Sequence, residues 1–413
     1  MQAVSSVCVV GLGYIGLPTA AMLASRGLRV RGVDTNPATV GAVNSGQVPF
    51  VEPDLARLVA QAVAAGNLAA APAPAEAEAY VVAVPTPVNP DRSPDLSYVM
   101  AAVDSISQVL GPGSLVVLES TSPPGATALA ARRIAANRPD LAAPGGELAV
   151  DLAYCPERVL PGRVVQELVS NDRIVGGLTP RAAHRAADLY RTFCQGEIMS
   201  TDAVTAELAK LVENAFRDVN IAFANELSLV CDKLGVDVRR LIELANHHPR
   251  VAILSPGPGV GGHCIAVDPW FIAAAAPAET QLIQCARHLN DSMPGRVGAK
   301  VAAALAGQGA PTVAALGLAF KANIDDLRES PARAVVAALA QAYPDGLIRV
   351  VEPHISQLPP ELAQRRNVEL ASLADALAGA DAVVLLVDHD AFRQRPPSLP
   401  PNVPVIDTRG LWR

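Results

Sequence analysis

Short apolar runs alternate with amphipathic, alanine-rich runs over about the first 200 residues, as expected for a sheet covered by helices. Val7–Val10 predicts a buried strand, and Leu17–Arg26 predicts a helix that ends at Gly27. Arg29–Val33 predicts the next strand. Two further apolar runs predict strands: Tyr80–Val84 and Leu115–Leu118.

The strand pattern stops between about residues 201 and 290. Ala203–Leu234 contains neither proline nor glycine and predicts one long helix that ends at Gly235, followed by a second helix that ends near Asn246. Apolar residues cover much of the circumference of the long helix, which favours burial against a second copy of the chain in a homodimer.

Strands return after about Gly309, at Val313–Leu316, Ile348–Val351, Val383–Val387 and Val403–Ile406. The predicted fold class is therefore α/β, with two Rossmann-like doubly wound domains joined by a helical central segment. The expected domains are residues 1–200, 201–300 and 301–413.

A glycine turn joins the first strand to the first helix. Gly11, Gly13 and Gly16 form a G-x-G-x-x-G pattern, and Asp34 closes the second strand. In this context the three glycines allow a tight turn, close approach of a pyrophosphate and close packing of helix on strand. A carboxylate at Asp34 accepts from a ribose 2′-hydroxyl and repels a 2′-phosphate, so the sequence predicts NAD as cofactor, in preference to NADP.

Composition limits the remaining classes. Among 413 residues the formal net charge is −7, which argues against a nucleic-acid partner. No apolar run is long enough for a membrane span, and no signal peptide is evident. The six cysteines lack metal-ligand spacing, and the adjacent His247 and His248 bring no third ligand, so we expect no metal, reduced thiols and a cytoplasmic location.

Polar residues follow several predicted strands, where a doubly wound sheet presents its ligand-binding loops. Thr86, Thr121 and Thr127 are candidates to contact the cofactor or the reacting centre, with turn and capping roles as the alternative. Glu157 and Arg158 lie on another such loop.

On the long predicted helix, Lys210, Asn214 and Arg217 share one face. This stripe favours an anion-binding site over a solvated surface, because no acidic residue is in register with it. Later in the chain, Gly317 to Lys321 places a lysine at a strand end, where it could bind a nucleotide phosphate.

One thiol stands apart from the others. Cys264 lies in the glycine-rich segment Gly257–Trp270, and Asp268 follows four residues later. A ligand can closely approach a thiol on such a loop, so Cys264 is a candidate nucleophile. The alternative is a small buried residue on a turn.

Eight segments together resemble the nucleotide-sugar 6-dehydrogenase family, also known as the UDP-glucose/GDP-mannose dehydrogenase family. They are GLGYIGLPTA, VPTP, ESTSPPG, AYCPERVLPG, AELAKLVENAFRDVNIAFANELS, NHHPRV, GPGVGGHCIAVDPWF and GLAFKANIDDLRESPA. The segment CPERVLPG and the final Gly410-Leu-Trp-Arg413 are similar to the bacterial branch that oxidises UDP-N-acetyl-D-mannosamine.

The resemblance implies a four-electron oxidation of a UDP-sugar at C6, in which two NAD are reduced. It implies that Lys210 helps to remove the hydroxyl proton, that Cys264 forms a thiohemiacetal and then a thioester, and that Asn214 stabilises the oxyanion. Asp268 would orient Lys210 or a water, and Glu157 would assist hydrolysis.

The resemblance also implies two sets of binding residues. Those expected to bind NAD, beyond the three glycines, are Tyr14, Ile15, Asp34, Thr86, Thr127 and Arg328. Those expected to bind the sugar nucleotide are Arg158, Val159, Arg217, His248, Arg250, Gly261, Phe320 and Lys321, beside Lys210 and Asn214.

Three alternatives remain open. The same chemistry could act on UDP-N-acetylglucosamine or another UDP-hexose, because one epimeric centre is not readable from sequence. A two-electron hydroxyacid dehydrogenase would need neither Cys264 nor a second α/β domain, and an NAD-binding sensor would not need the catalytic set. The number of NADH formed per sugar distinguishes these classes: two, one or none.

Overall fold

The computed structural model describes residues 4–50, 52–142, 147–160, 162–262, 264–394, 399 and 402–412. Three residues of the motifs quoted above, Pro161, His263 and Arg413, lie outside these ranges.

The chain forms two compact units. The first consists of Met1–Val212 and Trp270–Ala276, and the second of Glu213–Pro269 and Pro277–Arg413.

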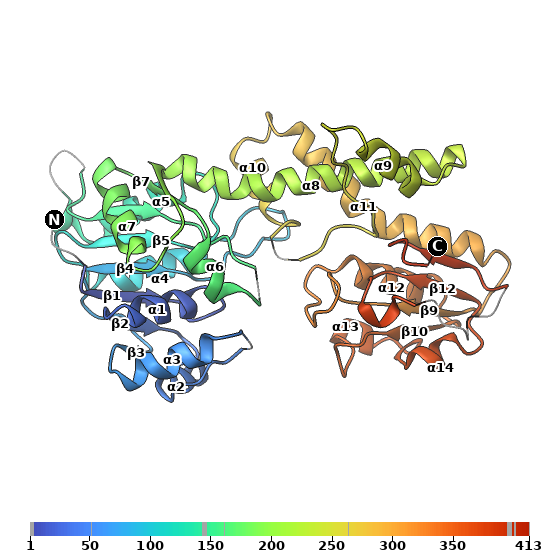
Figure 1. Ribbon diagram of the computed structural model, residues 1–413, viewed down its shortest axis with the longest axis horizontal. Helices are drawn as coiled ribbons and strands as arrows, with labels where there is room; N and C mark the ends of the chain where they lie inside the picture. Colours follow the sequence, from blue (N-terminus) through green and yellow to red (C-terminus); the bar gives the residue numbers. More distant parts are fainter. Residues whose placement is uncertain are drawn as a thin grey trace. The chain divides into compact units, whose positions relative to one another are not determined.

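The first unit is built on a sheet that has eight strands in the described part of the chain, in the order β3-β2-β1-β4-β5-β6-β7-β8 (Figure 1). All neighbours are parallel except β6 and β7, which are antiparallel. The strands are β1 (Ser6–Val10), β2 (Arg29–Val33), β3 (Leu68–Ala71), β4 (Ala79–Val82), β5 (Leu115–Leu118), β6 (Asp151–Tyr154), β7 (Arg173–Gly177) and β8 (Ile198–Asp202).

Helices cover both faces of this sheet, which is why its central strands are apolar throughout. Val7 and Val9 of β1 belong to one core layer, and the alternate residues Cys8 and Val10 belong to the other. The helices are α1 (Gly16–Ser25), α2 (Pro37–Asn44), α3 (Leu55–Ala64), α4 (Ser97–Ser107), α5 (Ala126–Asn137), α6 (Val164–Ser170) and α7 (Pro180–Arg191), with a 3₁₀ turn at Pro139–Leu141.

Four further helices lie between the two sheets in the sequence: α8 (Ala203–Leu234), α9 (Val238–Asn246), α10 (Asp268–Ala275) and α11 (Gln281–Ala304). In the second unit a buried polar network joins α8 to α11. Arg287 lies 2.5 Å from Asp218, and Asn290 donates to the same Asp218 carboxylate at 2.8 Å. Because these buried groups pair only in one register, they fix how the two helices pack.

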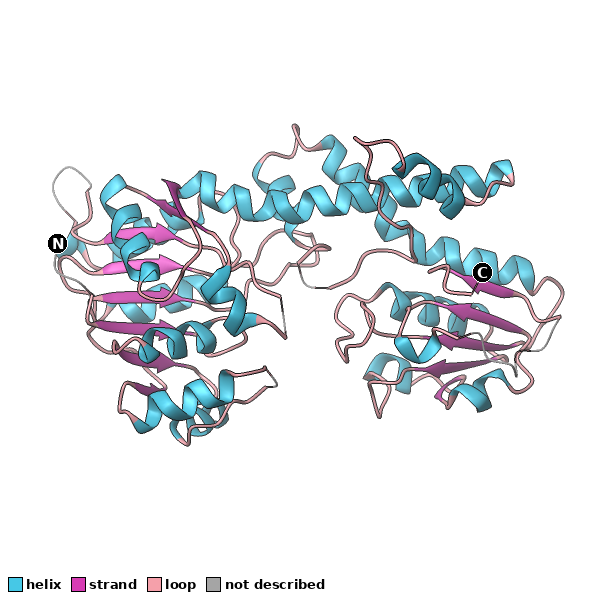
Figure 2. Ribbon diagram, viewed as in Figure 1, coloured by secondary structure: helices cyan, strands magenta, loops and turns pink. Residues whose placement is uncertain are grey.

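The second unit also contains a parallel sheet, whose strands are the second group of magenta arrows in Figure 2. Among the described residues it has five strands, in the order β11-β10-β9-β12-β13. Its strands are β9 (Thr312–Leu316), β10 (Leu347–Val351), β11 (Val368–Leu370), β12 (Ala382–Leu385) and β13 (Val405–Asp407). Its helices are α12 (Pro331–Ala342), α13 (Pro360–Ala363) and α14 (Leu373–Leu377), with a 3₁₀ turn at Asp390–Phe392.

The predicted fold class is confirmed: two parallel-sheet domains flank a helical segment. Some strand ends differ from the prediction, because β4 stops at Val82 and β12 at Leu385, before the turns that follow them. The last helix of the central segment extends to Ala304, beyond the expected boundary at 300, and the domain boundaries themselves stay a prediction.

Candidate functional site

The glycine turn between β1 and α1 has the geometry that its sequence predicts. Gly11 has φ +93° and a Cβ there would lie 2.5 Å from the Ala83 carbonyl oxygen, so only glycine fits. A Cβ on Gly16 would lie 1.8 Å from the Gly11 oxygen, which shows how closely α1 packs on the turn. Gly13 has no atom within 4 Å of its Cβ position, so the protein itself does not require a glycine there.

Asp34, at the end of β2, is tied to this turn. One carboxylate oxygen accepts from the Leu12 backbone N–H at 2.9 Å, and the other accepts from the Asn36 N–H at 2.8 Å. The side chain is partly exposed, so the carboxylate retains lone pairs toward solvent. The turn, the open Gly13 position and this acid together fit a dinucleotide, with the pyrophosphate at the start of α1 and a ribose at Asp34.

The other residues expected at the cofactor differ in exposure. Tyr14 is about half exposed and stacks on Phe50, with ring centroids 4.2 Å apart, while Ile15, Thr86 and Thr121 are partly buried. Thr127 is fully buried, and its hydroxyl donates to Glu207 at 2.6 Å. The contact of Thr127 with a cofactor stays a prediction.

Glu207 is a residue that the sequence analysis missed. Its carboxylate accepts from the backbone N–H groups of Gly125 at 2.6 Å and Thr127 at 2.7 Å, at the start of α5. Burial raises its pKa, although the hydrogen bonds from Thr127 and Gly125 act in the opposite direction. No local signal marks this role, because the partners are about 80 residues away in the sequence.

The loop after β6 carries Glu157, Arg158 and Val159. Glu157 is held in a buried ion pair with Arg173 of β7, at 3.1 Å, with side-chain exposures of 6% and 4%. The guanidinium of Arg173 also lies 4.8 Å from the centre of the Tyr190 ring. Arg158 and Val159 are partly buried.

A second missed residue, Glu52, fixes the far end of this loop. Its two carboxylate oxygens accept from the backbone N–H groups of Gly162 at 2.8 Å and Val164 at 2.9 Å. Glu52 is buried and lies 110 residues before Gly162, so this contact too had no sequence signal.

Helix α8 carries the predicted polar stripe. Lys210 is buried, Asn214 is partly buried and Arg217 is exposed. Asn214 has an acidic partner from outside the helix, since its amide nitrogen donates to Asp268 at 2.6 Å. The expectation that no acidic residue pairs with this stripe is therefore wrong. On α8 itself, Glu213 also lies four residues before Arg217, at the spacing of neighbours on one helix face.

Cys264 is partly exposed and lies in a turn just before α10. Its carbonyl oxygen accepts from the backbone N–H groups of Val267 at 3.0 Å and Asp268 at 2.8 Å. Asp268 is buried and is the first residue of α10. The turn therefore joins Cys264 directly to Asp268, the hydrogen-bond partner of Asn214.

The glycine-rich segment packs on the second sheet domain. A Cβ on Gly261 would lie 2.8 Å from Cβ of Phe320, and one on Gly262 would lie 2.9 Å from the Phe320 ring. The Gly262 N–H also donates to the Arg328 carbonyl at 3.1 Å. Within the second unit, the segment that leads to Cys264 is thus in contact with Phe320.

The remaining candidates of this unit are exposed. Lys321, His248 and Arg250 lie on the surface, and the guanidinium of Arg328 is paired with Asp326 at 2.6 Å. The binding roles of these residues stay predictions.

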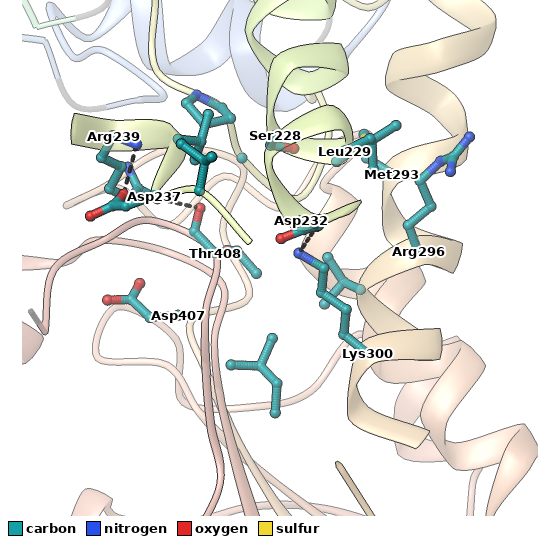
Figure 3. A pocket seen from close by; sticks show the side chains of 16 residues that line it. Ser228, Leu229, Asp232, Asp237, Arg239, Met293, Arg296, Lys300, Asp407 and Thr408 are labelled. Atoms are coloured by element: carbon teal, nitrogen blue, oxygen red, sulfur yellow. Dashed lines mark hydrogen bonds and ion pairs between the residues drawn. The ribbon is translucent and has the colours of Figure 1, made fainter. Parts of the chain in front are cut away.

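A cavity of about 270 Å³ also lies in the second unit (Figure 3). It is lined by the end of α8, the start of α9, α11 and β13, and none of the candidate site residues contributes to its lining. Its charged groups are partnered, with Lys300 2.5 Å from Asp232 and Arg239 donating to the Thr408 carbonyl at 2.9 Å. We therefore assign it no part in the chemistry.

The fold and the glycine turn define a dehydrogenase with an NAD-binding domain. Residues 5–194 match the NAD binding domain of the UDP-glucose/GDP-mannose dehydrogenase family. The central domain of that family matches residues 204–292, and its UDP binding domain matches residues 314–413. The chain belongs to the UDP-glucose/GDP-mannose dehydrogenase family, and the predicted resemblance and cofactor are confirmed.

Similar proteins span the whole chain. An NDP-N-acetyl-D-galactosaminuronic acid dehydrogenase of Ralstonia nicotianae is 54% identical, with 98% of this chain and 96% of that protein covered. A UDP-N-acetyl-D-mannosamine dehydrogenase of Escherichia coli is 52% identical, with 99% of each covered. A solved UDP-D-ManNAc dehydrogenase from Pyrococcus horikoshii is 37% identical with a TM-score of 0.88, over 99% of this chain and 96% of that one.

Within the described residues, no helix is both long and apolar enough to cross a membrane.

Proposed function

We propose that this enzyme oxidises C6 of UDP-N-acetyl-D-mannosamine to a carboxylate, giving UDP-N-acetyl-D-mannosaminuronate. The observation that carries the proposal is Cys264 itself. It is a partly exposed thiol on a glycine-rich segment that packs on Phe320. It lies four residues before Asp268, which accepts a hydrogen bond from Asn214. A dehydrogenase that stops at an aldehyde or ketone needs no such thiol.

The thiol is needed because an aldehyde has no carbinol that can give up a second hydride. In the first oxidation Lys210 takes the hydroxyl proton as hydride leaves C6. The Cys264 sulfur then adds to the aldehyde carbon, and the thiohemiacetal hydroxyl loses its proton as the second hydride leaves. Water cleaves the resulting thioester, which releases the carboxylate and restores the thiol. NAD, when bound, accepts one hydride in each oxidation, so two NAD are consumed per sugar.

Asn214 supports this chemistry as a donor to the tetrahedral oxygen. An asparagine amide has two N–H groups, and Asp268 engages one of them at 2.6 Å, which leaves the other for a substrate oxygen. Asp268 thereby orients Asn214 and makes its amide a better-fixed donor. Glu157, kept in place by Arg173, is assigned to the hydrolysis of the thioester.

The choice of an N-acetylated hexosamine is supported by the relatives. The protein of E. coli is named for UDP-N-acetyl-D-mannosamine and that of R. nicotianae for an N-acetylgalactosaminuronic acid, at similar identity. The second candidate is therefore the same reaction on a UDP-N-acetylgalactosamine, which differs in configuration at carbons of the sugar ring. Phe320 and Lys321 would contact the uridine diphosphate in either case.

The test is a panel of UDP-sugars in which NADH formed per sugar is counted. We expect two NADH with UDP-N-acetyl-D-mannosamine as the preferred substrate. One NADH per sugar would contradict the four-electron reaction, and preference for another UDP-hexose would reassign the substrate.

Cys264→Ser is the companion variant, with the exposed thiol variant Cys285→Ser on α11 as its control. A serine hydroxyl is a far weaker nucleophile at neutral pH, so the variant should lose formation of the uronic acid while it still binds NAD and the UDP-sugar. Steady turnover by Cys264→Ser at the rate of the Cys285→Ser control would contradict the proposal.

We further propose a homodimer held by α8 and a cytoplasmic location. Phe216, Phe223 and Val230 are spaced by seven residues on α8 and are all exposed, with Phe216 at 70% and Phe223 at 52%. Helix residues at this spacing lie on one face, and such a face is normally covered by a partner. The buried thiols Cys8, Cys155, Cys194 and Cys231 are free, as expected in a reducing compartment.

A further inference from the structure

The second unit repeats the cofactor-binding turn of the first, with different chemistry. Gly317 follows β9 as Gly11 follows β1, and both have φ +93°. The Gly317 N–H donates to the Val351 carbonyl at 2.8 Å, just as the Gly11 N–H donates to Val33 at 2.8 Å. The sequence after Gly317, Leu-Ala-Phe-Lys, therefore occupies the place of the Leu-Gly-Tyr-Ile that follows Gly11.

Glu352 takes the place of Asp34 in this repeat. Its Oε2 accepts from the backbone N–H groups of Leu318 at 2.7 Å and Ala319 at 3.0 Å. Its Oε1 accepts from the His354 N–H at 3.1 Å, as Asp34 accepts from Asn36. In both units an acid at the end of the second strand holds the turn that follows the first.

The two acids differ in what else they contact. Asp34 is partly exposed, whereas Glu352 is buried and its Oε2 lies 3.0 Å from Nε2 of His389, a fully buried ring. Burial alone would raise the pKa of Glu352, but the hydrogen bonds from His389, Leu318 and Ala319 together lower it. Glu352 is thus an ionised carboxylate. Because the His389 ring occupies its Oε2, this carboxylate does not accept from a ribose hydroxyl as Asp34 is expected to do.

His389 also holds the other end of the turn. Its Nδ1 accepts from the Asn323 N–H at 2.9 Å, and the Asn323 side-chain oxygen accepts from the Asp390 N–H at 3.0 Å. Because Asn323 has a left-handed φ of +61°, its conformation needs such support. Glu352 and His389 therefore fix Leu318 and Asn323, on either side of Phe320 and Lys321.

We propose that Glu352 and His389 are positioning residues for nucleotide binding by the second unit. They hold the turn so that Phe320 and Lys321 face a uridine diphosphate. The hydrogen bond between His389 and Glu352 also occupies the carboxylate, which would otherwise be able to bind a ribose diol. The inference rests on the proposed function, in which Phe320 and Lys321 contact the uridine diphosphate.

The geometry argues against a metal ion at this cluster. Glu352, His354 and His389 bring potential ligand atoms within 4.8 Å of one another. However, both nitrogens of His389 already have hydrogen-bond partners, and so do both oxygens of Glu352. The exposed His354 is therefore a matched control for the buried pair.

The experiment measures binding of UDP and of NAD separately, by calorimetry, to the wild-type enzyme and four variants. His389→Leu removes both hydrogen bonds of the ring, Glu352→Gln weakens the tie to the turn, and His389→Asn keeps an acceptor near the place of Nδ1. We expect His389→Leu to weaken UDP binding roughly tenfold to a hundredfold, with Glu352→Gln in the same direction and partial recovery in His389→Asn. NAD affinity and the turnover number at saturating UDP-sugar should change less than about twofold, and His354→Ala should behave as wild type.

The outcomes separate this inference from the function on which it rests. A wild-type enzyme that binds no UDP would overturn the proposed function. If His389→Leu binds UDP as tightly as the wild type, the positioning role alone is overturned. A joint loss of UDP and NAD affinity would also overturn it, because it indicates general unfolding and not a local effect on the turn. A zinc-dependent rise in the thermal midpoint that His354→Ala abolishes would replace the positioning pair with a metal site.

Discussion

Asp34 and Glu119 each follow a strand of the first sheet, but the different burial of their carboxylates suits them to different roles. Asp34 is partly exposed and is bonded to the backbone of the cofactor turn. Glu119 follows β5, is almost completely buried, and accepts from the hydroxyl groups of Tyr190 at 2.7 Å and Thr19 at 3.2 Å. The first is suited to a ligand and the second to the interior.

Asp34→Ala should weaken NAD binding by roughly tenfold and narrow the preference for NAD over NADP. In the proposed NAD site the carboxylate would accept from the ribose 2′-hydroxyl and repel a 2′-phosphate, and it also holds the Leu12 N–H of the turn. Titration of both cofactors checks this, with Asp34→Asn as the variant that keeps an acceptor without the charge. Unchanged affinity for both cofactors in Asp34→Ala would show that Asp34 does not contact the ribose.

Glu119 should make stability depend on pH. Burial, followed by the nearby charge of Glu157, raises its pKa to about 7 from an ordinary value of 4.5. Because the folded state binds the proton more tightly, this group stabilises the fold below about pH 4.5, and that contribution is lost as pH rises through about 7. Relative to Glu119→Gln, the wild type should lose about 2.5 kcal/mol of stability between pH 5 and pH 8.

Thermal unfolding of both proteins at the two pH values measures this difference. The gap between the wild-type and Glu119→Gln midpoints should shift in favour of the variant as pH rises. A gap that does not change with pH would mean that Glu119 titrates alike in the folded and unfolded states.

At the scale of the element, α8 shows what a sequence pattern can define. Its predicted limits, Ala203 and Leu234, agree with the structure, because the run contains no helix breaker and Gly235 ends it with φ +69°. The pattern also places Lys210 and Asn214 one turn apart on α8. It does not reveal that Asp268 binds Asn214, since Asp268 lies 54 residues further along the chain.

Lys210 and Asn214 should act as one unit in catalysis. Loss of a donor to a developing oxyanion costs about 100- to 1000-fold in rate, so Lys210→Ala should slow turnover by about that factor or more, with a smaller change in substrate affinity. If both groups serve one oxygen, the turnover number of the double variant Lys210→Ala with Asn214→Ala should fall by a smaller factor than the product of the factors for the two single variants.

The measurement is a double-mutant cycle on the turnover number at saturating NAD. Asp268→Asn is a useful companion, because it keeps the side-chain shape while it weakens the acceptor for Asn214. Losses that multiply cleanly in the double variant would show that Lys210 and Asn214 act independently.

At the scale of the whole molecule, the proposed dimer accounts for the exposed apolar face of α8. Replacing Phe216 and Phe223 by serine should turn a dimer into a monomer at micromolar concentration in sedimentation velocity, because these side chains are exposed in the single chain. Tyr98→Ser, at an equally exposed aromatic on α4, is the control and should leave the dimer intact. A wild-type monomer with full activity would contradict the proposal.

The sequence by itself determined the fold class of two sheet domains with a helical segment between them in the chain, the limits of α8 and the glycine turn with its acid. These features depend on residues that are neighbours in the chain: a strand, a turn that only glycine can form at Gly11, and a helix packed on that turn at Gly16. Local periodicity and backbone conformation are written in such short segments, so the pattern was sufficient.

Only the tertiary structure decided how the site residues are held. Glu207 fixes the start of α5, Glu52 fixes the loop after β6, and Glu352 with His389 fixes the turn before Phe320. Each of these carboxylates is buried, where it needs hydrogen-bond partners. The partners Thr127, Gly162 and His389 each lie more than 30 residues away in the sequence. Because such pairings depend on how the chain folds back on itself, no local pattern of residues could have indicated them.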